Sequence, residues 1–457
     1  MTNRLDKGIN ETPLIAWLGD DYTGAAAVME VLAFAGLPTI LFLDRPTEAE
    51  MARHREVAAF GIATMARTGS PEWMERHLPP LFALLRDTGA ALVHYKICST
   101  LDSSPTIGSI GKAMEIGVQV FGPAAIPIVT AAPKMRRYQL FGNLFASAPE
   151  GVFRLDEHPV MSVHPVTPMT DADVARHLRQ QTEMPLGCID IETLAHHERA
   201  ATALDGGAQP MGWTMDLMDT RHEAAVGRLL WERREKSRFV VGSQGVEYAL
   251  AAFWCAAGLL SGASKIKGIG RAAKMAVVSG SVSPITAAQI AWARDDGFAT
   301  IPFEVEAVSA SEEALQAAED RAFAQAISAL EAERIPLIYS AEGPEDPRVH
   351  ALREAAGDDL ARANDAIGQA LGRILKRLIE KTGLRRAIVS GGDTSGHVCT
   401  ALGVYALEAL APTIPGASIS TAHAEGAMNG LELALKGGQM GSPDYFGWVR
   451  DGGGERD

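Results

Sequence analysis

Residues 14–24 of the chain read LIAWLGDDYTG, an apolar run that stops at a glycine and two aspartates. A run of about five apolar residues bounded by a turn signal is typical of a buried β-strand. The alanine-rich stretch from Ala25 to about Ala35 predicts a helix, which Gly36 ends. A buried strand that leads through a polar loop into a helix is the repeating unit of a parallel sheet.

This alternation recurs in both halves of the chain. Further buried strands are predicted at residues 39–43, 57–63, 91–95, 126–129, 188–191, 239–241, 275–278, 335–339 and 387–389. Helices are predicted at residues 72–86, 107–120, 223–234, 246–260, 285–295 and 360–381, the last with an exposed face of Arg373, Lys376, Arg377 and Lys381. Residues 134–168 lose the alternation and predict a loop-rich insertion or a hairpin. The sequence therefore predicts an α/β fold of largely parallel sheets flanked by helices.

The length of the chain indicates two domains. Its 457 residues exceed the span of one domain, which is about 100 to 200 residues. Residues 261–270 contain several Gly and Ser and separate two strong strand–helix signals, so they are the best linker. We therefore predict an N-terminal domain over residues 1–262 and a C-terminal domain over residues 271–457, each with its own sheet.

Composition disfavours several classes of protein. The net charge of −14, from 42 Lys and Arg against 56 Asp and Glu, argues against a nucleic-acid or anionic-membrane partner. The apolar stretch at 248–260 is shorter than the roughly 20 residues that span a bilayer. No secretory signal is visible at the start, and the four cysteines are widely scattered. We expect a cytoplasmic protein without disulfides, and we leave open whether it forms a homo-oligomer.

Polar residues follow the first strand at the edge where parallel sheets bind their ligands. Asp20, Asp21 and Thr23 lie in this loop. A carboxylate here could orient a polyol hydroxyl or accept its proton. The alternative, to which we give equal weight, is that one of these residues only caps the helix that follows.

A second polar loop follows the strand at 91–95. Lys96, Ser99 and Thr100 place an ammonium beside two hydroxyls, which could hold a carboxylate or a phosphate. Asp102 adds a further hydrogen-bonding group. The alternative is a lysine that packs its stem and extends its amine to solvent.

Three glycine-containing loops in the second half could hold phosphates, because backbone N–H groups approach an anion closely where no side chain intervenes. They contribute Ser281 and Ser283, then Gly391, Gly392, Asp393 and Thr394, and finally Gly437 and Gly438. Asp393 could also contact Mg²⁺. Tight turns without a ligand are the alternative.

Several common motifs are absent. The glycines from Gly268 precede a strand, whereas a dinucleotide fingerprint follows one. Residues 108–113 lack the spacing of a P-loop. His196 and His197 are the only adjacent histidines and are interpreted as surface residues on a helix, because no metal-ligand spacing accompanies them. The sequence therefore identifies no metal ligands.

Six short motifs occur in a specific order along nearly the whole chain: GDDYTGA at 19–25, Lys96 with Ser99 and Thr100, GSQG at 242–245, GSVS at 280–283, GGDTSG at 391–396 and GGQMGS at 437–442. This ordered set resembles the four-carbon acid sugar kinase family, which includes 3-oxo-tetronate, threonate and erythronate kinases. The resemblance implies an N-terminal α/β domain that binds a sugar acid and a C-terminal α/β domain that binds ATP.

The resemblance also implies roles for the loop residues in transfer of a phosphoryl group from ATP, with Mg²⁺ bridging the phosphates. Asp20 or Asp21 would orient the accepting hydroxyl and take its proton, and Lys96 would neutralise charge. Substrate contacts would come from Thr23, Ser99, Thr100 and Asp102. ATP contacts would come from Ser281, Ser283, Gly391, Gly392, Asp393, Thr394, Gly437 and Gly438. The implied activity is phosphorylation of a terminal hydroxyl of a tetronate or 3-oxo-tetronate.

The chain departs from the family pattern at three positions. Ala27 replaces the last acidic residue of the first motif, Cys98 replaces an aspartate, and Asp102 replaces an arginine. Loss of that arginine removes a cation that could hold the substrate carboxylate. The acceptor could therefore be a branched five-carbon acid such as 3-oxo-isoapionate, or another residue could supply the charge. An alternative of another class is a non-catalytic, nucleotide-binding metabolite sensor or effector.

Overall fold

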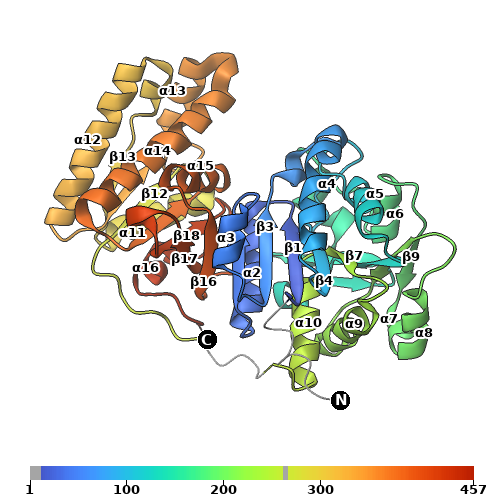
Figure 1. Cartoon of the computed structure of the whole chain (residues 1–457). Helices are drawn as coiled ribbons and strands as arrows, with labels where there is room; N and C mark the ends of the chain where they lie inside the picture. Colours follow the sequence, from blue (N-terminus) through green and yellow to red (C-terminus); the bar gives the residue numbers. More distant parts are fainter. Residues whose placement is uncertain (1–11, 261–265, 457) are drawn as a thin grey trace. The chain divides into compact units, whose positions relative to one another are not determined.

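A computed structural model describes residues 12–260 and 266–456, and the chain divides into two compact units (Figure 1). Unit 1 comprises Met1–Ala263 and unit 2 comprises Ser264–Asp457. The first half of the predicted linker, residues 261–265, lies outside the described residues. The domain limits at 262 and 271 stay predictions.

Unit 1 contains a fully parallel sheet with the strand order β2-β3-β1-β4-β11-β5-β10-β9. Its strands are β1 (Ile15–Gly19), β2 (Thr39–Phe42), β3 (Ala59–Ala63), β4 (Leu92–Lys96), β5 (Ala125–Val129), β9 (Leu186–Ile189), β10 (Met211–Met215) and β11 (Phe239–Gly242). Gly19 pairs with Ala63 on one side and with Lys96 on the other. This register brings the loops after β1, β3 and β4 to the same edge of the sheet.

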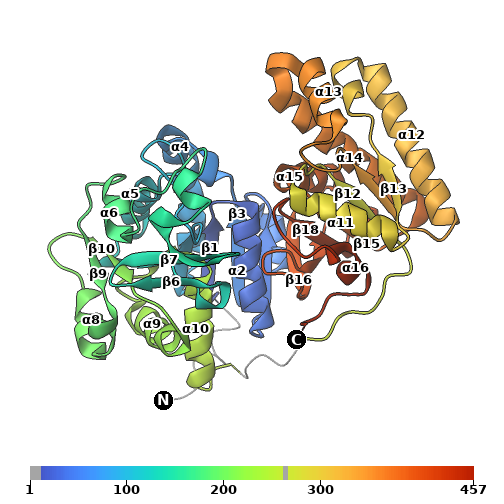
Figure 2. The same ribbon diagram turned by 180° about the vertical axis from the view of Figure 1, so that it is seen from behind.

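The helices of unit 1 form two groups that pack on the sheet (Figures 1 and 2). One group is α2 (Tyr22–Phe34), α9 (Thr220–Arg233) and α10 (Gly245–Ala256), and the other is α4 (Pro71–Asp87) and α5 (Ile110–Phe121). Helix α2 begins three residues before the predicted start, because Asp21 caps it. Helix α5 begins three residues after its predicted start, because Ser109 caps it. Fully buried aromatic residues between sheet and helices include Trp17, Phe82, Tyr95 and Phe239.

Residues 134–168 form a small antiparallel sheet followed by two 3₁₀ turns (Figure 2). Its strands are β6 (Arg137–Leu140), β7 (Asn143–Ala148) and β8 (Gly151–Arg154). The hairpin alternative of the sequence prediction is therefore correct. Most of its residues remain partly exposed, so no strong apolar pattern marks these strands.

The short helices of unit 1 are α3 (Glu48–Arg53), α6 (Val174–Arg179), α7 (Ile191–Leu194) and α8 (His197–Ala203). His196 is exposed, and His197 begins α8 and lies 2.7 Å from Glu232. This confirms the predicted surface position of the histidine pair. Over the two described ranges, no group of three or more His, Cys, Asp or Glu side chains could hold a metal ion.

Unit 2 contains a sheet with the order β13-β14-β12-β15-β18-β17-β16. Its strands are β12 (Met275–Ser279), β13 (Ala299–Pro302), β14 (Pro336–Tyr339), β15 (Arg386–Ser390), β16 (Ala406–Ala411), β17 (Ile419–His423) and β18 (Leu431–Lys436). The sheet is parallel from β13 to β18, and β17 pairs antiparallel with both β16 and β18. Ser390 pairs with Ser279 and with Lys436, so three strands end side by side.

The helices of unit 2 are α11 (Pro284–Asp295), α12 (Glu312–Glu331), α13 (Pro347–Ala356), α14 (Leu360–Thr382), α15 (Gly392–Leu402) and α16 (Tyr445–Arg450). The predicted exposed basic face of α14 is wrong in part. Arg373 pairs with Glu319 at 2.5 Å and Arg377 pairs with Asp320 at 2.8 Å, because α12 packs along this face.

The cysteines and the helices bear on two features that the sequence argued against, disulfides and a membrane span. All four cysteines, Cys98, Cys188, Cys255 and Cys399, are free thiols in the structure. Among the described helices, none combines the length and apolarity needed to cross a membrane.

Candidate active site

Two adjacent carboxylates and one arginine form a cluster at the carboxyl edge of the unit 1 sheet. The Arg67 guanidinium donates through Nη2 to Asp20 Oδ1 at 2.7 Å and to Asp21 Oδ1 at 2.8 Å. Its Nε donates to Asp20 Oδ2 at 3.2 Å. Arg67 lies four residues after β3 and meets the loop after β1 because these two strands are neighbours. Arg67 was not among the residues predicted from the sequence.

Asp20 is the buried member of the pair, with 3% of its surface exposed. Both of its carboxylate oxygens accept hydrogen bonds from Arg67, and its backbone N–H donates to Lys96 O at 2.9 Å. Burial raises the pKa of Asp20, and the Arg67 guanidinium opposes this change. Asp20 is therefore positioned to hold Arg67 rather than to meet a substrate directly.

Asp21 is more accessible, with a side chain 27% exposed. Its Oδ1 accepts the Gly24 N–H at 2.9 Å and thereby caps α2. Within residues 12–260, the hydrogen bonds to this carboxylate reach Oδ1, and Oδ2 has none. The capping alternative is thus correct for one oxygen, while the other oxygen remains available to a ligand.

Lys96 lies beside the same carboxylate. It is 2% exposed, and its Nζ donates to Ile97 O at 2.7 Å. A Cβ atom placed on Gly24 would lie 2.3 Å from Asp21 Oδ1 and 2.9 Å from Lys96 Nζ. Only glycine therefore fits between the ammonium and the carboxylate. Lys96 is therefore packed into the site. The alternative, in which its amine extends to solvent, is wrong.

The loop after β4 connects its polar residues by hydrogen bonds. The Thr100 hydroxyl donates to Asp102 Oδ1 at 3.0 Å, and the Cys98 sulfur lies 3.0 Å from the same hydroxyl. Burial raises the pKa of the Cys98 thiol, and nearby Arg67 opposes this change. Cys98, Thr100 and Asp102 therefore form one chain of contacts beside Arg67. Ser99 and Thr23 are half-buried at the same edge, and no hydrogen bond of the described residues joins their side chains to this chain.

Arg137, the first residue of β6, is a further cation near Cys98. Its Nη1 donates to Ser147 Oγ at 2.9 Å, and its Nε is buried without a hydrogen-bond partner. Burial lowers the pKa of Arg137. Among the described residues, no carboxylate pairs with it, in contrast to Arg67. Arg137 was not predicted from the sequence, because it lies in the segment without a clear periodic pattern.

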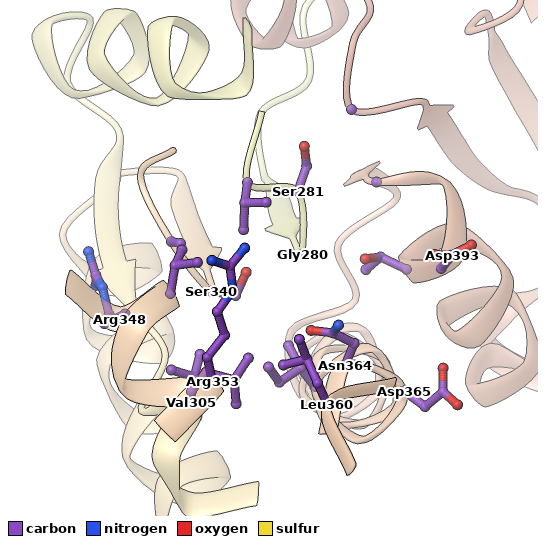
Figure 3. Close-up of a pocket in the computed structure, with 18 of the residues that line it drawn as sticks. Gly280, Ser281, Val305, Ser340, Arg348, Arg353, Leu360, Asn364, Asp365 and Asp393 are labelled. Atoms are coloured by element: carbon purple, nitrogen blue, oxygen red, sulfur yellow. The ribbon is translucent and has the colours of Figure 1, made fainter. Parts of the chain in front are cut away.

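A cavity of about 330 Å³ lies in unit 2 at the ends of β12, β15 and β18 (Figure 3). One part of its wall is apolar and the other part consists of glycine-containing loops. The apolar wall contains Val282, Val305, Val349, Leu352, Leu360 and Ile367. Of the predicted ATP contacts, six line the cavity: Ser281, Gly391, Gly392, Asp393, Thr394 and Gly438. Ser283 and Gly437 are the two that do not line it.

The three glycine-containing loops fit tightly into one another. A Cβ on Gly280 would lie 2.2 Å from Thr394 Oγ1, and a Cβ on Gly438 would lie 2.5 Å from Ser281 Oγ. Gly391 has a φ of +126° and would bring its Cβ 2.8 Å from Thr394 Oγ1. These positions require glycine, because a side chain there would occupy the space that Thr394 or Ser281 already fills.

The N-terminus of α15 opens onto this cavity. Gly391 occupies its cap position and has no side chain to bond the first N–H groups of the helix. By contrast, Ser283 caps α11 by accepting the Thr286 N–H at 3.0 Å. Free N–H groups and the positive end of the helix dipole favour an anion such as a phosphate. An apolar wall beside an anion site matches the two halves of a nucleotide.

Charged side chains on the opposite wall were not predicted from the sequence. Arg353 of α13 lines the cavity, and Figure 3 shows its side chain extending toward Ser281 and Ser340. Arg348 also lines the cavity, but Asp346 pairs with it at 2.6 Å. Along the described chain, Arg353 has no ion-pair partner, so its charge is free to meet a phosphate.

Known proteins resemble the chain over almost its full length. A 3-oxo-isoapionate kinase from Paraburkholderia graminis is 42% identical over 445 residues, which are 96% of this chain and 94% of that protein. A 3-oxo-tetronate kinase from Methylobacterium radiotolerans is 33% identical over 445 residues, 95% of this chain and 98% of that protein. The chain belongs to the four-carbon acid sugar kinase family. The resemblance inferred from the six motifs is therefore confirmed.

Family models and a solved structure agree with this assignment. The model of a sugar-binding N-terminal domain matches residues 15–250, and that of a nucleotide-binding C-terminal domain matches residues 276–446. A solved structure from Salmonella typhimurium LT2 is 26% identical, with a TM-score of 0.76, and the match covers 95% of this chain and 98% of that one. The predicted α/β fold with two domains and the predicted enzyme class, a sugar-acid kinase, are both confirmed. The sensor alternative is not favoured.

Proposed function

We propose that this four-carbon acid sugar kinase transfers the γ-phosphoryl group of ATP to a terminal hydroxyl of a 3-oxo acid sugar, with Asp21 as the general base. The assignment of the base is carried by the environment of the two Asp21 carboxylate oxygens. Oδ1 accepts from Gly24 and Arg67 and lies close to the Lys96 ammonium, while Oδ2 accepts no hydrogen bond within residues 12–260. A fixed carboxylate next to a fixed cation suits the removal of a hydroxyl proton while negative charge moves toward the acceptor oxygen.

In the proposed reaction, Asp21 Oδ2 takes the proton of the acceptor hydroxyl while the oxygen of that hydroxyl forms a bond to the γ-phosphorus. The bond between that phosphorus and the β–γ bridging oxygen breaks, and ADP leaves with the bridging oxygen. Lys96 stabilises the negative charge on the transferred group. Asp20 acts through Arg67, which it holds with both carboxylate oxygens.

For the nucleotide, we assign the phosphates to the N-terminus of α15 and the base to the apolar wall of the cavity. Gly392, Asp393 and Thr394 would donate backbone N–H groups, which the uncapped helix leaves available, while the Gly391 N–H donates to Lys436 O at 2.9 Å. The Ser281 hydroxyl and the Arg353 guanidinium lie on the walls around them. Ser283 and Gly437 would support this site without direct contact.

The residues of the cavity also fit Mg²⁺ as part of a magnesium–nucleotide complex. Mg²⁺ commonly takes one or two carboxylates and completes its shell with phosphate oxygens and water. Asp393 supplies an exposed carboxylate in the first turn of α15, and no ion pair of the described residues occupies it. Bound there, the ion would neutralise phosphate charge, which is the chemistry it supplies in phosphoryl transfer.

The acceptor has two candidates. A four-carbon 3-oxo-tetronate agrees with the family as a whole and with the relative that is 33% identical. A branched five-carbon acid of the 3-oxo-isoapionate type is favoured by one observation, the 42% identity to a kinase of that name. Cys98 and Asp102, where the family pattern has Asp and Arg, lie beside Arg67 and would alter the space and charge around such a substrate.

A coupled ADP-release assay with Mg-ATP tests the proposal. The acceptors are threonate, erythronate, their 3-oxo forms and 3-oxo-isoapionate, each at several concentrations. Turnover with one of the 3-oxo acids supports the proposal, and the ratio of kcat/KM values identifies the acceptor. ADP binding without turnover on any of these acids would contradict it.

Arg137 is predicted to hold the carboxylate of the acid sugar, in place of the arginine missing at position 102. The change Arg137→Gln is expected to raise KM for the acid roughly tenfold to a hundredfold, because a charge-assisted hydrogen bond to the carboxylate is lost. KM for ATP and the thermal midpoint are expected to remain near the wild-type values. Steady-state kinetics with each substrate varied in turn provide the measurement.

The matched control for this prediction is Arg154→Gln. Arg154 lies in β8 of the same small sheet, but its guanidinium pairs with Asp156 at 2.7 Å on the surface. Its replacement should leave both KM values unchanged. Equal KM values for the acid in Arg137→Gln and Arg154→Gln would show that Arg137 does not bind the substrate.

A further inference from the structure

Lys436 is a buried lysine directly beneath the loops that we assign to the nucleotide. It is the last residue of β18 and is 1% exposed. It pairs with Ser390 at the end of β15, and Ser390 pairs with Ser279 at the end of β12. Each of these strands leads directly into one of the three glycine-containing loops. Lys436 is therefore at the common base of the three loops.

The surroundings of Lys436 are polar but carry no compensating charge. Its Nζ donates to Gly437 O at 3.0 Å and to Thr286 Oγ1 at 3.4 Å. Two strands away, at the end of β12, Ser279 Oγ is buried without a hydrogen-bond partner. In residues 266–456, no carboxylate forms an ion pair with Lys436. Burial lowers the pKa of this amine to about 8.

Few titratable groups lie on the elements around Lys436. Asp393 is in the first turn of α15, and its carboxylate lines the cavity. On β15 and β18, the nearest charged residues are Arg386 and Glu432, which pair with each other at 2.7 Å four residues before the strand ends. Helix α11 presents the hydroxyl of Thr286, which does not titrate. An anion that balances the Lys436 charge therefore has to come from outside the chain or from Asp393.

A chain of hydroxyl groups leads from Lys436 to the cavity. Thr286 Oγ1 accepts from Lys436 and donates to Ser281 Oγ at 2.9 Å. Gly438 O is a second acceptor for Thr286 at 3.1 Å, but it also accepts the hydroxyl of Ser283, and the contact of Thr286 with Ser281 is the shorter one. Ser281 Oγ also accepts the Ser283 N–H at 3.4 Å. Because the Ser281 oxygen accepts from these neighbours, its own proton is directed to a partner in the cavity.

We propose that Lys436 is a positioning residue for nucleotide phosphates, whose ammonium orients the hydroxyls of Thr286 and Ser281 and supplies a buried positive charge under the phosphate loops. This inference rests on the proposed function, which puts the phosphates in this cavity. A buried cation without a partner is costly, and a bound phosphate a few ångströms away offsets that cost. Lys436 thus favours the liganded state of the loops.

The experiment measures ADP affinity by titration calorimetry between pH 7.5 and 9.5. ADP is used without an acid sugar, and its terminal phosphate is fully ionised over this range because the second phosphate pKa is about 6. The proteins are the wild type, Lys436→Met, Thr286→Val and the control Lys381→Met. Lys381 is an exposed lysine at the end of α14. Thr286→Val keeps the size of the side chain and interrupts the hydroxyl chain.

The wild type is expected to lose ADP affinity roughly tenfold between pH 7.5 and 9.5, because the lysine charge is lost above a pKa of about 8. Lys436→Met should bind roughly tenfold to a hundredfold more weakly at pH 7.5 and should show no such loss. Thr286→Val should weaken binding and keep the pH dependence in reduced form. Lys381→Met should match the wild type at every pH.

Two results would overturn the inference. One is wild-type ADP affinity in Lys436→Met at pH 7.5, and the other is an affinity of the wild type that does not change over the pH range. If Lys436→Met fails to fold, the wild-type pH profile and Thr286→Val decide the question by themselves. A wild type that binds no ADP would refute the proposed nucleotide site itself, a result distinct from the two above.

Discussion

Asp21→Asn is expected to lower kcat by about two to four orders of magnitude, the usual effect of losing a general base. The Asn side chain keeps the size of Asp and caps helices about as well, so α2 should retain its first turn. Its amide oxygen can still accept from Gly24 and Arg67, as Oδ1 does in the wild type. What the change removes is the second oxygen and its negative charge. Affinity for ADP should stay within about twofold, because the proposed nucleotide contacts lie in unit 2.

The measurement combines kcat from the coupled assay, ADP affinity from calorimetry and the thermal midpoint. Asp219→Asn is the matched control, because Asp219 caps α9 and also pairs with an arginine, Arg221, at 2.8 Å. It carries the same chemical change and has no proposed role in the reaction. A kcat for Asp21→Asn close to that of Asp219→Asn would refute the assignment of Asp21 as the base.

Arg67→Met is expected to lower the free energy of unfolding by about 3–5 kcal/mol, the range for removing one partner of a buried ion pair. The change leaves Asp20, which is 3% exposed, without the cation that meets both of its oxygens. It also leaves Asp21 beside Asp20 with no arginine between their charges. The proposed acid sugar site should lose its geometry together with the stability of unit 1.

Urea unfolding followed by tryptophan fluorescence is the measurement, with Trp17 of β1 as a buried reporter in unit 1. The double variant Asp20→Asn with Arg67→Met should recover at least half of the lost free energy, because it no longer buries an unpaired carboxylate. The surface control, Arg221→Met, removes the partner of Asp219 and should change stability by less than about 1 kcal/mol. A similar loss in Arg67→Met and Arg221→Met would contradict a buried, structural role for Arg67.

Much of the fold was predictable because buried parallel strands leave a strong apolar pattern. The strands that end at Gly19, Lys96, Ser279 and Ser390 were all predicted to within about one residue. Helix ends were less predictable. The start of α2, for example, is set by the hydrogen bond from the Gly24 N–H to Asp21 Oδ1. The antiparallel strands β16 and β17 were not predicted, because both mix small and polar or charged residues with only one or two large apolar ones.

The candidate site was predictable where its residues follow a strand in one continuous motif. Asp21, Lys96 and the glycine-containing loops meet this condition. Arg67 was missed, although the rule of examining the loop after each strand would have found it four residues beyond β3. The position of Arg137 in β6 and the burial of Lys436 depend on contacts between distant segments, which no local pattern records. The cytoplasmic location and a homo-oligomer stay predictions.

The interlocked glycines of unit 2 have a consequence for how sequences of this family can change over time. Gly280 and Gly391 both face the hydroxyl of Thr394, and Gly438 faces that of Ser281. A methyl group on any of these glycines collides with an atom of another loop, so single replacements are not accepted. A larger residue at Gly280 becomes acceptable only when position 394 loses its hydroxyl. Homologous sequences should therefore show correlated replacements between positions 280 and 394 and between positions 438 and 281, and such a paired change should restore nucleotide binding that the glycine replacement alone abolishes. Gly391 should stay unchanged, because its φ of +126° strains any other residue.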